Sequence, residues 1–165
     1  TTKDGIRLVS KPIREDSTLL KPIFASEMTL SAQDVNKALH DSFLPLKGGG
    51  GSGGCHLRAM LNLTYATSAG LKFNDQTLVD YDLNRNTLNG QFYSPQDPTS
   101  LSLTMDIYID RTSVEVFIDD GLYSFSMERR RAVGTHDGGG GKGFEFWGQD
   151  INVTDIKLDA VESCW

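Results

Sequence analysis

The sequence predicts an all-β fold: an antiparallel β-sandwich of two sheets, of the jelly-roll or concanavalin-like kind, in a single domain. Three observations predict it. Apolar and polar residues alternate with a period of two along much of the chain, as they do in strands with one buried face. The alternating segments are short, and Gly, Asn, Asp or Pro bounds them. The chain has 165 residues, which is enough for one hydrophobic core.

Two stretches carry the alternation over the greatest length. In residues 55–66 and 101–110 every second residue is apolar, so each stretch predicts a strand with one side in the core. The expected core residues are Leu57, Ala59, Leu61, Leu63 and Tyr65 in the first stretch, and Leu101, Leu103, Met105, Ile107 and Ile109 in the second.

The segment "TSVEVFIDDGLY", residues 112–123, predicts a hairpin. Val114, Val116 and Ile118 lie on one face of its first strand, and Glu115 and Phe117 lie on the other. The "DDG" that follows could hold a calcium ion, but Asp-Asp-Gly between two strands is also ordinary turn chemistry, which we favour. With the short segments "QTLVDYD", "GQFY", "LYSFSM" and "GFEFW", we expect nine to eleven strands.

Two further segments depart from simple alternation. In "DINVTDIKLDAV" the pattern slips after Val153 and resumes at Ile156, which predicts a β-bulge near Asp155. The segment "SAQDVNKALHDSF" predicts a helix, with its apolar residues spaced by four along one side. These residues are Val35, Leu39 and Phe43.

The run "GGGGSGG", residues 48–54, matches flexible linkers of engineered origin, because no packed element uses such a run. We interpret it as an engineered replacement for a loop. We therefore divide the domain into a leading segment with the first strand (1–16), the first part of the sandwich (17–47), the linker, and the remainder (55–165). A second glycine run at 136–143 is equally consistent with a natural loop.

Charge excludes two classes of partner. Sixteen basic and twenty-two acidic residues give a net charge of −6, whereas nucleic acids and anionic membrane surfaces require a positive face. We therefore expect no nucleic-acid and no membrane partner. The chain also contains no run of about 18 apolar residues that could span a bilayer.

The two cysteines, Cys55 and Cys164, are either unrelated buried thiols or one disulfide closing a long loop. The sequons at Asn62 and Asn152 are candidate N-glycosylation sites. Together these features favour a secreted or extracellular protein, or its vacuolar or periplasmic equivalent.

Signals for catalysis and for metals are weak. His40, His56 and His136 accompany no G-x-S-x-G motif, and we expect each to be a surface residue. No cysteine or histidine cluster has metal-ligand spacing, so we expect no metal and no cofactor. A glycosidase acid pair could be drawn from Asp110, Glu115 and Glu128, although outward charges on sandwich strands are usually a solvated face.

Sugar binding requires less of a sequence, namely an aromatic plate and a few polar groups for the hydroxyls. Phe117 shares its strand face with Glu115, which places both kinds of group together. The candidate ligand-binding residues are Tyr108, Asp110, Arg111, Glu115, Phe117, Glu128 and Trp147.

The segment "DRTSVEVFIDDG" resembles the "DRSSVEVF-NDG" strand pair of the C-terminal β-sandwich in glycoside hydrolase family 32, which includes invertases, levanases and inulinases. "TTKDGIRLVSKPIRE", "SAGLKFNDQTLVDYDLNRNTLNG" and "GFEFWGQDINVTDIKLDAV" are similar to other parts of that domain, in the same order. The family's catalytic motifs, "NDPNG", "RDP" and "EC", do not occur in these 165 residues. The resemblance therefore implies a domain that is not itself an enzyme.

The resemblance implies one of two roles. Some related sandwiches are carbohydrate-binding modules for levan or inulin, so the partner would be fructose or a fructan oligosaccharide. In most members the sandwich is a structural accessory that stabilises a catalytic propeller, so the partner would be a glycoside hydrolase catalytic domain. The basic stretch 129–131 and the glycine-rich residues after it depart from the family pattern.

Overall fold

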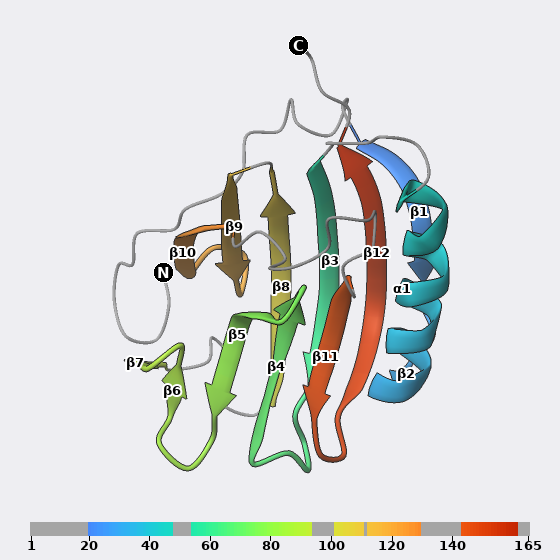
Figure 1. Ribbon diagram of the computed structural model, residues 1–165. Helices are drawn as coiled ribbons and strands as arrows, with labels where there is room; N and C mark the ends of the chain where they lie inside the picture. Colours follow the sequence, from blue (N-terminus) through green and yellow to red (C-terminus); the bar gives the residue numbers. More distant parts are fainter. Residues whose placement is uncertain (1–19, 48–53, 94–100, 111, 130–142, 162–165) are drawn as a thin grey trace.

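The computed structural model describes residues 20–47, 54–93, 101–110, 112–129 and 143–161. Two antiparallel sheets pack face to face, and one helix lies along one side of the pair (Figure 1). The fold is therefore the two-sheet, all-β sandwich that the sequence predicts. The leading segment 1–16 and residues 48–53 of the predicted linker lie outside the described residues.

The larger sheet has seven strands in the order β1-β12-β3-β8-β9-β10, and β2 also pairs with β12. Every pairing in it is antiparallel. Its strands are β1 (Leu20–Ser26), β2 (Leu30–Ser31), β3 (Gly54–Asn62), β8 (Ser102–Ile109), β9 (Ser113–Ile118), β10 (Tyr123–Glu128) and β12 (Asn152–Val161).

The smaller sheet has five strands in the order β11-β4-β5-β6-β7 and lies in front of the larger one in Figure 1. Its strands are β4 (Ser68–Phe73), β5 (Gln76–Asp82), β6 (Thr87–Leu88), β7 (Gln91–Phe92) and β11 (Phe144–Gly148). The described residues form twelve strands, more than the nine to eleven expected, because β2 and β6 have only two residues each and were not predicted.

The core lies between the two sheets and follows the predicted alternation. In β8 and β9 every second side chain is buried, and the intervening side chains are half-buried. The alternation fails at one predicted core residue, Tyr65, whose side chain is 79% exposed. β3 ends at Asn62, whose side-chain oxygen accepts a hydrogen bond from the Thr64 backbone N–H at 3.0 Å. The chain turns at this point, so the parity that would have buried Tyr65 is lost.

The predicted helix is α1 (Ala32–Lys47), which closes one side of the sandwich. Ser31 caps its first turn, because the Ser31 hydroxyl accepts from the Asp34 N–H and donates to the Asp34 carboxylate. Val35 and Leu39 are buried in the core, as predicted. The side chain of Phe43 lies outside the part that the structure describes.

Asp119 and Asp120 form a turn between β9 and β10, as predicted. Both have positive φ angles, of 50° and 55°, which short acidic side chains tolerate. The Asp119 carboxylate accepts hydrogen bonds from the Thr104 N–H and from the Tyr93 hydroxyl, so the turn is held against β8 and the segment after β7. Burial, followed by this hydrogen bond to Asp119, raises the pKa of Tyr93.

β12 contains the predicted bulge. Its register with β3 shifts between Thr154 and Lys157, and Asp155 has a φ of 50°. Two residues of β12 therefore oppose one residue of β3. Gly54, which we had assigned to the linker, is instead the first residue of β3, so the strand begins one residue earlier than expected.

Candidate functional site

A row of polar and aromatic side chains crosses the outer face of the larger sheet, away from the smaller sheet. Strand register places these residues directly opposite one another on five neighbouring strands. We call them the outer-face row: Asp159, His56, Tyr108, Glu115 and Ser126. The row exists because alternation in β3, β8 and β9 sends the opposite residues into the core.

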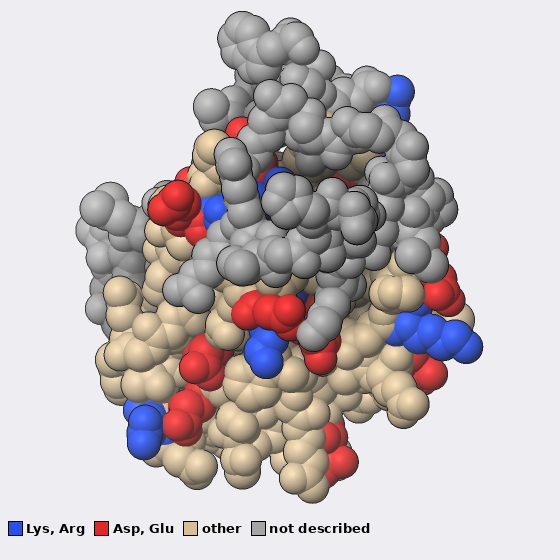
Figure 2. Space-filling model, viewed as in Figure 1, with Lys and Arg blue, Asp and Glu red and all other residues tan. Residues whose placement is uncertain are grey.

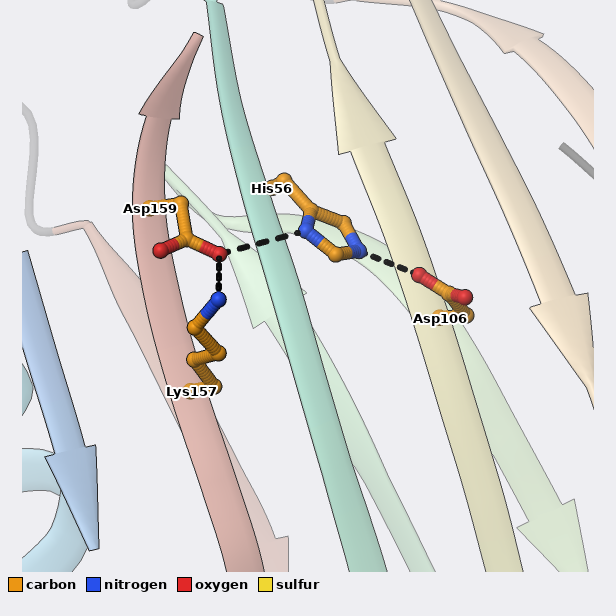
Figure 3. Close-up of polar contacts among 4 residues, drawn as sticks. All are labelled: His56, Asp106, Lys157 and Asp159. Atoms are coloured by element: carbon orange, nitrogen blue, oxygen red, sulfur yellow. Dashed lines mark hydrogen bonds and ion pairs between the residues drawn. The ribbon is translucent and has the colours of Figure 1, made fainter. Parts of the chain in front are cut away.

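His56 lies at the centre of the charged part of this row (Figure 3). Its Nε2–H donates a hydrogen bond to Asp106 Oδ1 on β8. On the other side its Nδ1 lies 3.5 Å from Asp159 Oδ2 on β12, an ion-pair distance. Lys157 Nζ lies 3.1 Å from the same Asp159 oxygen. Two carboxylates, one imidazole and one ammonium group are thus held together across three strands.

Asp159 is the most buried member of this cluster, with an exposed fraction of 0%. Neither of its oxygens accepts a well-formed hydrogen bond within the described part of the chain. A buried carboxylate requires compensating groups, and among the described residues Lys157 and His56 make the ion-pair contacts with Asp159. The cluster therefore joins β3, β8 and β12 through polar contacts on the outer face.

Aromatic rings contact one another across this face of the sheet. The rings of His56 and Tyr108 are parallel to within 18°, with their centroids 4.2 Å apart. Phe117 lies two residues from Glu115 on β9, and its ring meets that of Tyr108 in a T-shaped contact with the centroids 6.3 Å apart. Next to them the Ser126 hydroxyl donates a hydrogen bond to Glu115. Aromatic carbon surface and hydroxyl-binding oxygens are therefore adjacent on this face.

Three of the residues predicted from the sequence come together here: Tyr108, Glu115 and Phe117. Glu128 lies on the same face at the end of β10, opposite Ser113. Asp110 is exposed just beyond β8, where its carbonyl accepts a hydrogen bond from Arg129 Nη1 at 2.8 Å. Arg111 lies outside the described residues.

Trp147 is not part of this face, because it belongs to β11 of the smaller sheet. Its side chain lies over Gly70 of β4, where an added Cβ would approach Trp147 Nε1 to 2.7 Å. Figure 2 views this outer face of the smaller sheet, where acidic and basic side chains lie scattered among uncharged surface. No continuous basic patch covers the described part of the face in view.

The structure describes Cys55 and both sequon asparagines, but not Cys164. Cys55 is buried and is bonded to no other cysteine in the described ranges, and burial raises the pKa of its thiol to about 12. Cys164 lies outside the described residues, so the disulfide stays a prediction. Asn62 and Asn152 are both exposed and stand directly opposite each other on β3 and β12.

A second feature lies at the end of the sandwich where α1 begins. The β3–β4 and β11–β12 connections meet at this end, the lower one in Figure 1. They border a groove of about 590 Å³, which we call the helix-start groove. It is lined by Ser31, Ala32, Gln33, Tyr65, Gly148, Asp150, Ile151 and Asn152.

Sequence reasoning missed several of these residues. His56, expected at the surface, is only 6% exposed, because Tyr108 and two carboxylates surround it. His40 is exposed, as expected, and His136 lies outside the described residues. The slip in the alternation of β12 was a signal for Asp159, because the bulge there determines that Asp159 lies on the outer face opposite His56. Nothing in the sequence indicated that Tyr65 would be exposed at the groove rather than buried in the core.

The described residues contain neither a metal-binding cluster nor a membrane-spanning helix. Within the described ranges, no group of three or more His, Cys, Asp or Glu side chains is placed to hold a metal ion. In the same ranges, no helix has the length and apolar character needed to cross a membrane.

The fold and this face define the class of protein: a two-sheet antiparallel β-sandwich with polar and aromatic side chains arrayed on an outer face. The chain belongs to the glycosyl hydrolases family 32 C-terminal family, whose model matches residues 27–129. The resemblance seen in the sequence is thereby confirmed. No curated protein sequence matches the chain.

Solved structures show the same fold at low sequence identity. An exo-inulinase from Aspergillus awamori matches 99% of the chain with a TM-score of 0.60 and 15% identity. A sucrose-6-phosphate hydrolase from Lactobacillus gasseri matches 95% with a TM-score of 0.54 and 16% identity. The chain spans only 34% and 31% of these two proteins, about a third of their length.

Proposed function

We propose that this chain is a non-catalytic carbohydrate-binding domain that recognises fructose or fructan of the levan or inulin type. The observation that carries the proposal is the adjacency of Tyr108, Phe117 and Glu115 on one outer face. Apolar sugar faces pack on aromatic carbon, and sugar hydroxyls donate to carboxylates. The names of the structural relatives, an inulinase and a sucrose-phosphate hydrolase, support fructosides as the sugar class.

The charged cluster gives this face the rigidity that sugar recognition requires. His56 is fixed by Asp106 and Asp159, and its ring in turn supports one face of Tyr108. A side chain that is already ordered loses less conformational entropy when a ligand binds. The buried cluster thus acts as a positioning device, and Glu115 and Tyr108 make the proposed ligand contacts.

Isothermal titration with fructose, inulin and levan tests the proposal. We expect heat of binding with at least one of them, and a loss of about tenfold in affinity for Glu115→Gln and for Tyr108→Ala. Glu145→Gln, an exposed carboxylate on the smaller sheet, is the matched control and should bind as the unmodified chain does. Absence of heat and of retention on immobilised levan would exclude the proposed function.

A structural accessory role is the second candidate, favoured by the fact that the chain spans about a third of its structural relatives. In that role the domain would stabilise a catalytic propeller without binding sugar. It predicts an apolar surface left bare in the isolated domain. Weak self-association in sedimentation velocity, together with no sugar binding, would favour this role over the first.

Secretion is also proposed, since Asn62 and Asn152 are both exposed. Expression through a eukaryotic secretory pathway should yield protein whose mass falls on treatment with an N-glycosidase. Protein of unmodified mass from that host would contradict the sequon prediction.

A further inference from the structure

We propose that the helix-start groove is a second saccharide-binding subsite, in which a neutral sugar ring stacks on Tyr65. The subsite is separate from the outer-face row and was not predicted from the sequence. Its ligand class rests on the proposed carbohydrate-binding function. The groove has a volume of about 590 Å³, within the range of small-molecule sites.

Tyr65 is the residue that distinguishes this groove from an ordinary surface hollow. Its side chain is 79% exposed, and it makes no hydrogen bond or ring contact within the described part of the chain. Met28 and Phe92 are the other large apolar side chains exposed among the described residues, and neither lines the groove. An exposed tyrosine at the edge of a polar groove offers an aromatic face and a hydroxyl to the same ligand.

The chemistry of the lining selects a neutral, hydroxyl-rich ligand. The amide of Gln33 can both donate and accept hydrogen bonds, as sugar hydroxyls require, and the Asn152 amide can do the same in protein produced without N-glycosylation. An anion is disfavoured because Asp150 lines the groove and Asp34 already occupies the first turn of α1. A divalent cation is disfavoured because the described residues provide no cluster of metal ligands here.

The groove is also built on fixed backbone. Gly148 has a φ of 140°, and a Cβ added there would lie 2.9 Å from the Ser68 carbonyl oxygen. The connection can therefore pass close to β4 only with glycine at this position. Asn152 is paired in the ladder with both Ser31 and Asn62, so its amide projects from a central strand. Sites on paired strands are more precisely held than sites on free loops.

The two subsites are placed so that one long ligand could reach both. Asn62 joins Asn152 on β12 to Ser102 on β8, and Tyr108 lies six residues beyond Ser102, so roughly 20 Å along the strands separates the groove from the proposed ligand contact at Tyr108. Linking two weak contacts in one ligand raises the overall affinity through effective concentration. We therefore expect longer oligosaccharides to bind more tightly than fructose, with part of the gain depending on Tyr65.

The test compares Tyr65→Ala with Tyr65→Phe and with Phe92→Ala, using calorimetric titration. The sugars are fructose, inulin and levan oligosaccharides of increasing length, and a maltooligosaccharide. We expect Tyr65→Ala to lower affinity for the longer fructans about tenfold, whereas Tyr65→Phe keeps the ring and most of the affinity. Phe92→Ala removes an equally exposed aromatic outside the groove and should leave binding unchanged. Equal melting temperatures of the variants exclude a folding effect.

The outcomes separate this proposal from the proposed function. Fructan binding that Glu115→Gln weakens but Tyr65→Ala leaves intact would overturn the groove subsite and leave the function standing. Binding of the maltooligosaccharide alone, dependent on Tyr65, would support the groove and overturn the fructan assignment. No binding of any sugar by the unmodified chain would overturn both.

Discussion

Asn36 of α1 and Phe146 of β11 share two hydrogen bonds through one side chain. Asn36 Nδ2 donates to the Phe146 carbonyl at 2.8 Å, and the Phe146 N–H donates to Asn36 Oδ1 at 2.7 Å. The amide group thus replaces the missing neighbour strand at the edge of the smaller sheet. An edge strand with unpaired backbone groups is a template for pairing with another chain, and α1 removes that template here.

Replacing Asn36 should therefore both destabilise the domain and open this edge. Asn36→Ala removes both hydrogen bonds, and we expect a loss of about 1–3 kcal/mol in the free energy of unfolding. Asn36→Asp is the matched variant, because its carboxylate can still accept from Phe146 N–H but repels the Phe146 carbonyl. Urea unfolding measures the loss of stability in each of the two variants. Wild-type stability in the alanine variant would contradict the capping role of Asn36.

The contact between His56 and Asp159 leads to a prediction about buried charge. His56→Leu should cost about 3 kcal/mol or more in stability, because it leaves the fully buried Asp159 with Lys157 as its only charged neighbour among the described residues. The double variant His56→Leu/Asp159→Leu should recover part of the loss, since the fully buried Asp159 carboxylate is then absent. His40→Leu, at an exposed histidine, is the control. Additive single effects in this double-mutant cycle would show that the two residues are not coupled.

Cys55 contributes to an alkaline loss of stability. Burial raises its pKa from 9.0 to about 12, so the folded state holds a proton that the unfolded chain releases in this range. The stabilisation is fully present below about pH 9 and is lost as the pH rises toward 12. Under reducing conditions, Cys55→Ala should flatten the fall of stability with pH in that window, as followed by urea midpoints. An unchanged slope would contradict a buried thiol.

Burial also raises the pKa values of Tyr81 and Tyr93, so the stability of the Cys55 variant should still fall to some extent as the pH rises.

The predicted disulfide has its own test, in which a thiol-specific reagent is applied to the unfolded chain under non-reducing conditions. Two reactive thiols would exclude the bond between Cys55 and Cys164, and none would support it.

Gly70 is expected to be far less tolerant of substitution than Gly90. A Cβ at Gly70 would lie 2.0 Å from the Val79 carbonyl oxygen and 2.7 Å from Trp147 Nε1, so both the backbone contact with β5 and the indole must shift. We expect Gly70→Ala to cost roughly 1–3 kcal/mol and to shift Trp147 fluorescence to longer wavelength. Gly90 has a φ of 76° and open space around it, so Gly90→Ala should cost about 1 kcal/mol through backbone strain alone. Equal losses would contradict the packing of Trp147 on Gly70.

The sequence predicts the sheets well because strand alternation is a local property. Val114, Val116 and Ile118 are buried, and Glu115 and Phe117 lie on the opposite face, as their parity indicates. The turn at Asp119 and the bulge at Asp155 were also predictable, since residue type and a slip in the pattern record them in the sequence. The short strands β2 and β6 were not, because two residues carry no detectable period, whereas β7 was predicted from the segment "GQFY".

The sites were predictable only in part, because they depend on which strands become neighbours. Tyr108 and Glu115 lie on consecutive strands, so their proximity follows from one hairpin. His56 and Asp159 meet only because β3 pairs with β12, a contact across about a hundred residues of chain. Tyr65 was assigned to the core because Asn62 ends β3 through a side-chain hydrogen bond that alternation does not reveal.

The extra residue at Asp155 has a consequence for how this domain can change over evolution. Without it, Thr154 and Ile156 would oppose consecutive residues of β3, and every pairing from Lys157 onward would be kept. A relative one residue shorter at this point could therefore retain the Asp159–His56 contact and the buried face of β12. Loss of one residue at this position keeps the register of β12 with β3, whereas a deletion beyond a bulge that stays in place would move Asp159 to the core side of the sheet.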